Sequence, residues 1–310
     1  MRILLWHVHG SWTTSLVQGA HTFLVPVLPG RGPDGLGRAA TWDWPASVEE
    51  VTPDQAAGTD IDIVILQRPT ELASLAERWT RRRPGRDVPA VYVEHNTPEG
   101  PVAGAVHPAA GRPDITVVHV THFNQLFWDT GRAPSTVIEH GVVDPGHRYR
   151  GTLPHAAVVI NDPVSRGRVT GTDLLAAFRT VGRCDLFGMR SEPLGGQDLP
   201  QSQLHGAMAE RRLYLHLNRW TSLGLSLIEA MHLGMPVVAV EATAIREAVP
   251  DDAGIVSTRV SALRSGMRRL LSDPDEAAAL GRRARQVALE RFGLERFLED
   301  WDRLLERVAA

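Results

Sequence analysis

The sequence predicts an α/β protein with two domains, each built on a parallel β-sheet. A chain of 310 residues suits two domains of roughly 150 residues each. Short apolar segments alternate with helical segments in both halves, which is typical of parallel sheets. The segment Asp144-Pro145-Gly146 separates the two alternating series and has the composition of a linker.

The first series contains six expected strands and three expected helices. The strands are Ile3–Val8, Thr22–Val27, Asp62–Gln67, Ala90–His95, Ile115–Val120 and Thr136–His140. The helices are Thr13–Ala20, Thr70–Arg82 and Asn124–Thr130. The segment Gly30–Asp43 is rich in Gly and Arg and predicts a surface loop. It contains the pattern Gly-x-Gly-x-x-Gly, but it follows the second strand and contains Pro33, so a dehydrogenase is not indicated.

The second series also alternates. Its expected strands are Ala156–Asn161, Asp185–Met189, Leu213–Leu217, Val237–Val240 and Gly254–Ser257. Its expected helices are Thr172–Thr180, Gln201–Arg211, Leu225–Leu233 and two closing helices over residues 273–291 and 294–308.

The segment Trp220–Pro236 carries the clearest functional pattern. A polar turn precedes the apolar helix Leu225–Leu233, which ends at Gly234, a residue suited to a helix C-terminus. The turn directs free N–H groups outward, and such groups bind anions. Glu229 lies in the middle of the helix, and a buried carboxylate needs a partner. An arginine or the backbone is one such partner, and ligand hydroxyl groups, such as those of a ribose, are another.

Composition excludes several classes of protein. The net charge of −3 implies no general affinity for nucleic acid. No apolar run reaches the ~18 residues that a membrane span needs, and Ile3–Val8 resembles a strand more than a signal peptide. Cys184 is the single cysteine, which fits the cytoplasm. All 33 residues counted as Lys or Arg are arginine, so Walker-A and Schiff-base chemistry, which need lysine, are excluded.

The segment from Gly224 to Ala239 resembles the donor-nucleotide segment of retaining glycosyltransferases of the GT-B fold, family 4 type (group 1). The resemblance implies two Rossmann-like domains facing a central cleft. It implies an N-terminal acceptor-side domain over residues 1–148, a donor domain over 149–290, and a helix over 291–310 that returns to the first domain. In that family the second glutamate of the motif, here Glu229, holds the ribose. The first glutamate is replaced here by Thr221.

Further site residues follow from the same resemblance. The diphosphate is expected at Arg166, Arg168 and the turn Thr221, Ser222, Leu223, Gly224 and Leu225. Two guanidinium groups before a helix suit a diphosphate. The family also has a lysine in this segment, and Thr170 occupies that position here. The base is expected beside Gly188, Met189 and Leu199.

The first half supplies the remaining candidates. His9, Gly10, Ser11 and Trp12 follow the first strand, and strand ends in parallel sheets face the ligand. They are expected near the acceptor or the donor phosphates. His95 ends the fourth strand, and the family's histidine at a comparable position contacts the transferred sugar.

The sequence therefore predicts a cytoplasmic, bacterial hexosyltransferase that uses a nucleotide-diphosphate sugar and a small-molecule or glycan acceptor. It is expected to need no cofactor and no metal, and to be a monomer or homodimer. Two alternatives stay open. One is a glycosyltransferase-like binding protein without turnover. The other is a metal-dependent amidohydrolase, because His7-Val8-His9-Gly10 resembles the first metal-binding strand of those barrel enzymes.

Overall fold

A computed structural model describes all residues, Met1–Ala310, and divides the chain into two compact units. Unit 1 comprises residues 1–141 and 294–310, and unit 2 comprises residues 142–293. The breaks follow Gly141 and Gly293, whereas the sequence placed them after residues 148 and 290. The final helix belongs to unit 1.

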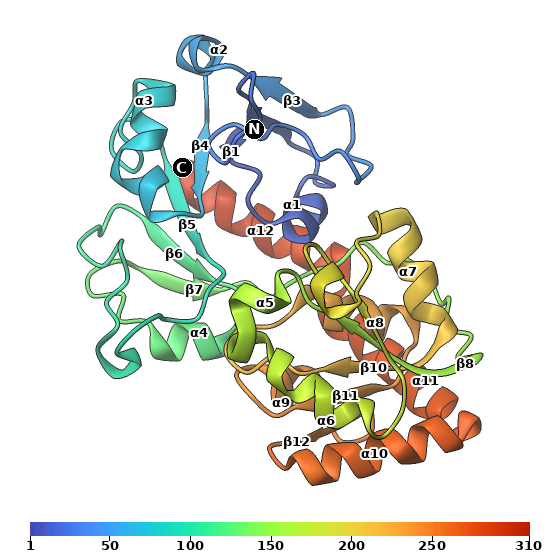
Figure 1. Cartoon of the computed structure of the whole chain (residues 1–310). Helices are drawn as coiled ribbons and strands as arrows, with labels where there is room; N and C mark the ends of the chain where they lie inside the picture. The colour runs from blue at the N-terminus through green and yellow to red at the C-terminus, as the bar shows by residue number, and fades with distance from the viewer. The chain divides into compact units, whose positions relative to one another are not determined.

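Unit 1 is built on a seven-stranded parallel sheet with strand order β3-β2-β1-β4-β5-β6-β7 (Figure 1). The strands are β1 (Arg2–Leu5), β2 (Thr22–Pro26), β3 (Val48–Val51), β4 (Ile63–Leu66), β5 (Ala90–Glu94), β6 (Thr116–His119) and β7 (Ser135–Val137). The helices are α1 (Gly10–Leu16), α2 (Pro53–Gly58), the π-helical turn η1 (Glu71–Leu75), α3 (Ala76–Thr80), the short η2 (Val102–Gly104), α4 (His122–Phe127) and α12 (Leu294–Ala309).

Both faces of this sheet are covered, which explains its continuous apolar strands. All four residues of β4 are fully buried. On one face, Leu4 and Tyr92 pack with residues of α2 and α3, and Trp6 meets Trp79 edge to face at 6.1 Å between ring centroids. On α12, Trp301 meets Trp12 of α1 at 5.6 Å, and this helix also contacts β4.

Unit 2 is built on a five-stranded parallel sheet with strand order β12-β11-β10-β8-β9. The strands are β8 (Leu153–Val159), β9 (Cys184–Phe187), β10 (Arg211–His216), β11 (Val237–Val240) and β12 (Gly254–Ser257). The helices are α5 (Pro163–Arg166), η3 (Gly167–Thr170), η4 (Thr172–Leu174), α6 (Leu175–Arg179), η5 (Glu192–Leu194), α7 (Gln201–Glu210), α8 (Leu225–Leu233), α9 (Ile245–Ala248), α10 (Val260–Ser272) and α11 (Pro274–Phe292).

The predicted fold class is confirmed, since each unit is an α/β domain on a parallel sheet. Helix α8 begins and ends where the sequence predicted, and Gly234 takes a left-handed conformation (φ 85°) at its C-terminus. The helix expected from residue 124 to 130 begins instead at His122 and ends at Phe127, after which Trp128 is extended and its indole N–H donates to Asn96.

Strand β3, helices α2 and α10 and several shorter helices were not predicted from the sequence. Strand β3 was missed because it is an edge strand with the acidic sequence Val-Glu-Glu-Val. Helix α2 has a capping box between Thr52 and Gln55, a signal that the sequence does contain. Helix α10 places Leu263, Met267 and Leu270 at helical spacing on its buried face, which is also visible in the sequence.

Close packing between α8 and α11 gives a first prediction. A Cβ atom at Gly281 in α11 would lie 2.0 Å from the carbonyl oxygen of Gly234. We therefore expect Gly281→Ala to destabilise unit 2 by about 1–3 kcal/mol, as overpacking does. The measurement is the unfolding free energy from denaturant titration.

Gly206→Ala in α7 is the matched control, because a Cβ atom at Gly206 meets nothing within 4 Å. That substitution should be neutral or stabilise the protein by up to about 1 kcal/mol, the usual gain from glycine to alanine in a helix. Equal effects of the two substitutions would contradict the packing described here.

Candidate functional site

The strand order of unit 2 reverses direction between β8 and β10. The chain runs from β8 to β9 on one side and then returns to β10 on the other side of β8. In open α/β sheets, ligands bind beyond the carboxyl ends of the strands at such a switch point. The segment after β8 contains Arg166 and Arg168, and the segment after β10 contains the turn 221–225. The predicted diphosphate residues therefore lie in the two segments that follow the strands on either side of the switch point.

These two segments also contact each other directly. The backbone N–H groups of Arg219 and Trp220 donate to the carbonyl oxygen of Val169 at 2.8 and 3.2 Å. Gly171 has φ 72°, and a Cβ atom there would lie 2.0 Å from the carbonyl oxygen of Leu217. A glycine is therefore required at residue 171 both for its conformation and for its contact.

The two predicted arginines differ in their surroundings. The Arg168 side chain is 78% exposed and forms an ion pair with Asp173 at 3.0 Å, and Asp173 also binds Arg219 at 2.6 Å. Arg166 is also exposed but has no ion pair with a carboxylate; partial desolvation lowers the pKa of its guanidinium from the usual value, and the charge of Asp162 opposes this shift. Of the two, Arg166 is the cation that remains available to an anionic ligand.

The N-terminus of α8 is a second source of positive potential. Gly224 is its N-cap residue, and no side chain caps the helix. The first N–H groups of a helix have no partner within the helix and carry a partial positive charge. Because α8 follows the turn after β10, these N–H groups belong to the switch-point segments.

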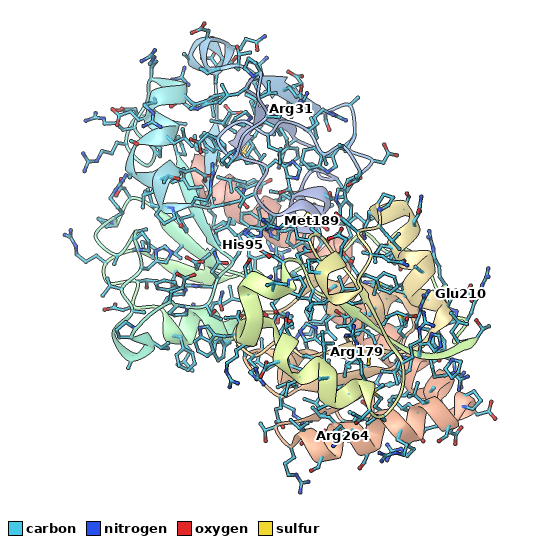
Figure 2. All side chains as sticks on the ribbon, in the orientation of Figure 1. Arg31, His95, Arg179, Met189, Glu210 and Arg264 are labelled. Carbon is cyan, nitrogen blue, oxygen red and sulfur yellow. The ribbon has the colours of Figure 1, made fainter.

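The predicted base-side residues lie at the end of β9 and in the loop that pairs with it. Gly188 has φ 128°, and its N–H donates to the carbonyl oxygen of Gln197 at 3.0 Å. A Cβ atom at Gly188 would lie 2.4 Å from the carbonyl oxygen of Ile160, so the residue must be glycine. Met189, which Figure 2 labels, is 52% exposed, and Leu199 is partly buried. The loop that carries Leu199 is thus held against the end of β9.

Glu229 is 4% exposed, and two side chains of α7 lie beside its carboxylate. The side-chain nitrogen of Gln201 and Nε2 of His205 lie 3.4 and 3.3 Å from its carboxylate. These two neighbours are neither arginine nor backbone groups. Ribose hydroxyl groups as partners stay a prediction.

The two departures from the family's motif take different positions. Thr170 is buried, and its hydroxyl donates to the carbonyl oxygen of Gly167 and lies 3.1 Å from the Thr172 hydroxyl. Thr170 therefore does not take over the role of a lysine. Thr221 is partly exposed, and its hydroxyl accepts from the Asn218 side chain at 3.3 Å.

His216 is a residue that sequence analysis missed. It ends β10, is 2% exposed, and has no partner for Nε2. A Cβ atom at Gly224 would lie 2.7 Å from the His216 ring, so the imidazole packs directly against the head of α8. Burial lowers the pKa of His216 to about 4, so the ring is neutral at pH 7. Its position just before the Trp220–Pro236 segment could have identified it as a candidate site residue.

In unit 1, the predicted residues at two strand ends lie side by side. The rings of His9 and His95 are 4.0 Å apart between centroids, and Trp12 meets His95 edge to face at 4.8 Å. Gly10 begins α1, and a Cβ atom on it would lie 3.3 Å from the Trp42 indole nitrogen. Ser11 also belongs to α1, and its carbonyl oxygen accepts from the Ser15 hydroxyl at 3.3 Å.

The histidines of this group are neutral at pH 7. Burial, and secondarily the neighbouring His7, lower the pKa of His9 to about 4. Burial lowers the pKa of His140 to about 3, and it holds the pKa of His95 well below the usual value. These groups therefore act as hydrogen-bonding partners, and an imidazolium acid is not available here.

The fold excludes the amidohydrolase alternative, because that reading needs a barrel and the chain forms two open sheets. No group of three or more His, Cys, Asp or Glu side chains converges in a way that could hold a metal ion. None of the helices combines the length and the apolar character that crossing a membrane requires.

Part of unit 2 matches a known protein family. Residues 195–287, which include α8, match the model of the family Glycosyl transferases group 1. No curated protein sequence is significantly similar to the chain.

Solved structures share the fold at low sequence identity. Sucrose-phosphate synthase from Thermosynechococcus elongatus matches with a TM-score of 0.73 and 13% identity over 99% of both chains. HepE from Anabaena, in complex with UDP and glucose, matches with a TM-score of 0.69 and 15% identity over 99% of this chain and 100% of HepE. TarM matches with a TM-score of 0.62 and 16% identity over 78% of this chain, which spans only 54% of TarM.

These likenesses define the fold as GT-B, with two parallel-sheet α/β domains. Together with the matched segment they support a group 1 glycosyltransferase.

The buried His216 gives a prediction for stability against pH. Its folded-state pKa of about 4 lies below the unfolded value of about 6.5. Between these values the unfolded chain binds a proton that the folded chain does not, so stability falls as pH falls, by up to about 1.4 kcal/mol per pH unit. Denaturant titrations from pH 7 to 4.5 should show a smaller loss for His216→Leu than for the parent. Parallel curves would contradict the burial of a neutral ring.

Proposed function

We propose that this protein transfers a hexose from a nucleotide-diphosphate sugar to a small-molecule or glycan acceptor, with retention of configuration, as in family 4. Unit 2 binds the donor nucleotide, and unit 1 contributes the His9–Trp12 segment and His95. The proposal depends on the switch-point edge of unit 2. There, Arg166 has no ion pair and the N-terminus of α8 has no side-chain cap. Helix α8 lies within the segment that matches the family.

The chemistry follows from the charges at this edge. A nucleoside diphosphate gains negative charge on its terminal phosphate as the sugar leaves. Fixed N–H groups and a guanidinium stabilise that charge without reorganisation. Arg166 and the N-terminal N–H groups of α8 fit this role. The chain contains no lysine that could take it. HepE and TarM have been crystallised with UDP, which agrees with a nucleotide donor.

Donor binding gives the first test of the proposal. A thermal-shift screen with UDP, GDP, ADP and TDP identifies the base, since a ligand that binds the folded state raises the melting temperature. Arg166→Ala should then weaken the selected nucleotide about ten- to a hundredfold, because a charge-assisted contact contributes ~1.5–3 kcal/mol. Calorimetry measures this loss.

Arg268→Ala is the matched control, since Arg268 is an exposed arginine on α10 of the same unit. Its nucleotide affinity should equal that of the parent. If Arg166→Ala also binds like the parent, the diphosphate assignment is wrong.

The ribose assignment has its own test. Glu229→Gln should weaken a ribonucleoside diphosphate more than its 2′,3′-dideoxy analogue, because only the former has hydroxyl groups that donate to the carboxylate. The two affinities are measured by calorimetry on the parent and the variant. If both ligands lose the same affinity, Glu229 does not bind the ribose and instead holds α7 in place through His205 and Gln201.

The sugar contact is tested by turnover. His95→Ala should lower the rate of transfer while the affinity for nucleoside diphosphate stays unchanged, since the residue is assigned to the sugar. A parent protein that binds nucleotide but neither transfers nor hydrolyses the donor is instead a binding protein without turnover.

A further inference from the structure

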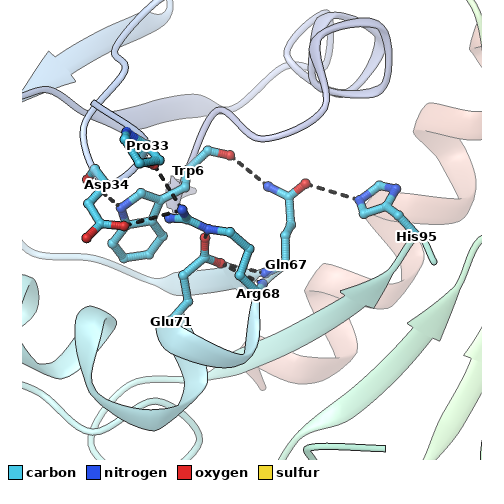
Figure 3. A network of polar contacts seen from close by, with 7 residues as sticks. All are labelled: Trp6, Pro33, Asp34, Gln67, Arg68, Glu71 and His95. Carbon is cyan, nitrogen blue, oxygen red and sulfur yellow. Dashed lines mark hydrogen bonds and ion pairs between the residues drawn. The ribbon is translucent and has the colours of Figure 1, made fainter. Parts of the chain in front are cut away.

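A chain of buried hydrogen bonds in unit 1 ends on His95 (Figure 3). Trp6 and Gln67 follow β1 and β4, the neighbouring strands between which the order of this sheet reverses. The side-chain nitrogen of Gln67 donates to the carbonyl oxygen of Trp6 at 2.7 Å. The side-chain oxygen of Gln67 lies 3.1 Å from Nε2 of His95. Gln67 is 3% exposed, so both ends of its amide are used inside the protein.

The Trp6 carbonyl fixes which way the Gln67 amide points. A carbonyl oxygen only accepts, so the amide end that faces Trp6 must be the NH₂ group. The amide oxygen therefore faces His95, and it can only accept. His95 must then carry its hydrogen on Nε2. The tautomer follows from the hydrogen-bond pattern.

The other nitrogen of His95 is consequently an acceptor. Burial keeps the ring neutral at pH 7, so Nδ1 has a free lone pair, and no hydrogen bond within the protein reaches it. The tilted ring contact with His9 and the edge contact with Trp12 hold the plane of the ring. Nδ1 is therefore an oriented acceptor for a donor group of a ligand.

The backbone of Gln67 is held in place by Glu71 and Arg68. The buried carboxylate of Glu71 accepts from the backbone N–H of Gln67 at 2.6 Å and from the guanidinium of Arg68 at 2.6 Å. Arg68 also donates to the carbonyl oxygen of Pro33 at 3.0 Å. The indole N–H of Trp6 donates to the carbonyl oxygen of Asp34 at 3.1 Å, so the Gly-rich loop is fastened to the same network (Figure 3).

We infer that Gln67 is a positioning residue that locks His95 in the Nε2–H tautomer and presents Nδ1 as the acceptor for a sugar hydroxyl group. The identity of the ligand rests on the proposed function, whereas the assignment of the tautomer rests only on the hydrogen bonds of Gln67. A hydroxyl can donate to Nδ1, whereas a carbonyl or a phosphate oxygen cannot. The arrangement therefore selects for a donating hydroxyl at this point of the ligand.

The tautomer is tested by NMR on the intact protein labelled with ¹⁵N-histidine. The His95 resonances are assigned by their loss in His95→Gln. In the parent, His95 should show a protonated Nε2 and an unprotonated Nδ1. Gln67→Met keeps the volume and removes both hydrogen bonds, so the His95 resonances should shift toward a mixture of tautomers.

Gln18→Met is the matched control, since Gln18 is a glutamine of unit 1 whose side chain donates to the backbone carbonyl of Thr14. It should leave the His95 resonances unchanged. A protonated Nδ1 in the parent, or an unchanged tautomer in folded Gln67→Met, would overturn the positioning role.

The ligand is tested by turnover with the donor that the parent uses. Gln67→Met should lower kcat about tenfold or more, because the acceptor is no longer oriented. It should leave the affinity for the nucleoside diphosphate unchanged. If the tautomer shifts as expected and kcat does not fall, the sugar hydroxyl is the wrong ligand. If the parent neither binds nucleotide nor turns over a donor, the proposed function fails, while the NMR result stands independently.

Discussion

The contact between the segments after β8 and β10 is the constraint on which the candidate donor site depends. Two consecutive N–H groups, of Arg219 and Trp220, donate to the one carbonyl oxygen of Val169. Gly171 allows the backbones to approach, because any side chain there would overlap the Leu217 carbonyl. This contact fixes where the Arg166 segment lies relative to the turn before α8. Without it, the arginine and the helix N-terminus would belong to two independent loops.

The two units offer different chemistry at their strand ends. Unit 2 offers positive potential, because Arg168 and Arg219 share Asp173 while Arg166 stays unpaired. Unit 1 offers neutral imidazoles, because burial lowers the pKa of His9 and His95. The proposed donor has both kinds of group, an anionic diphosphate and a neutral, hydroxyl-rich sugar.

The sequence predicted the features that depend on local pattern. The alternation of strands and helices gave the fold class, and the apolar run before Gly234 gave the bounds of α8. It could not predict contacts between side chains that are distant in sequence. Gln67 and His95 are 28 residues apart, and their hydrogen bond depends on the pairing of β4 with β5. The same holds for Glu229, whose neighbours on α7 precede it by 24 and 28 residues.

The most direct test of the account is hydrogen–deuterium exchange of the intact protein with and without the nucleoside diphosphate that binds most tightly. Backbone N–H groups in residues 161–172 and 218–230 should exchange more slowly with the nucleotide bound, because these segments flank the switch point of unit 2. Strand β12, at the edge of the same sheet, should be unchanged. Protection confined to other segments, or no protection at saturating nucleotide, would contradict the assignment of the donor to this edge.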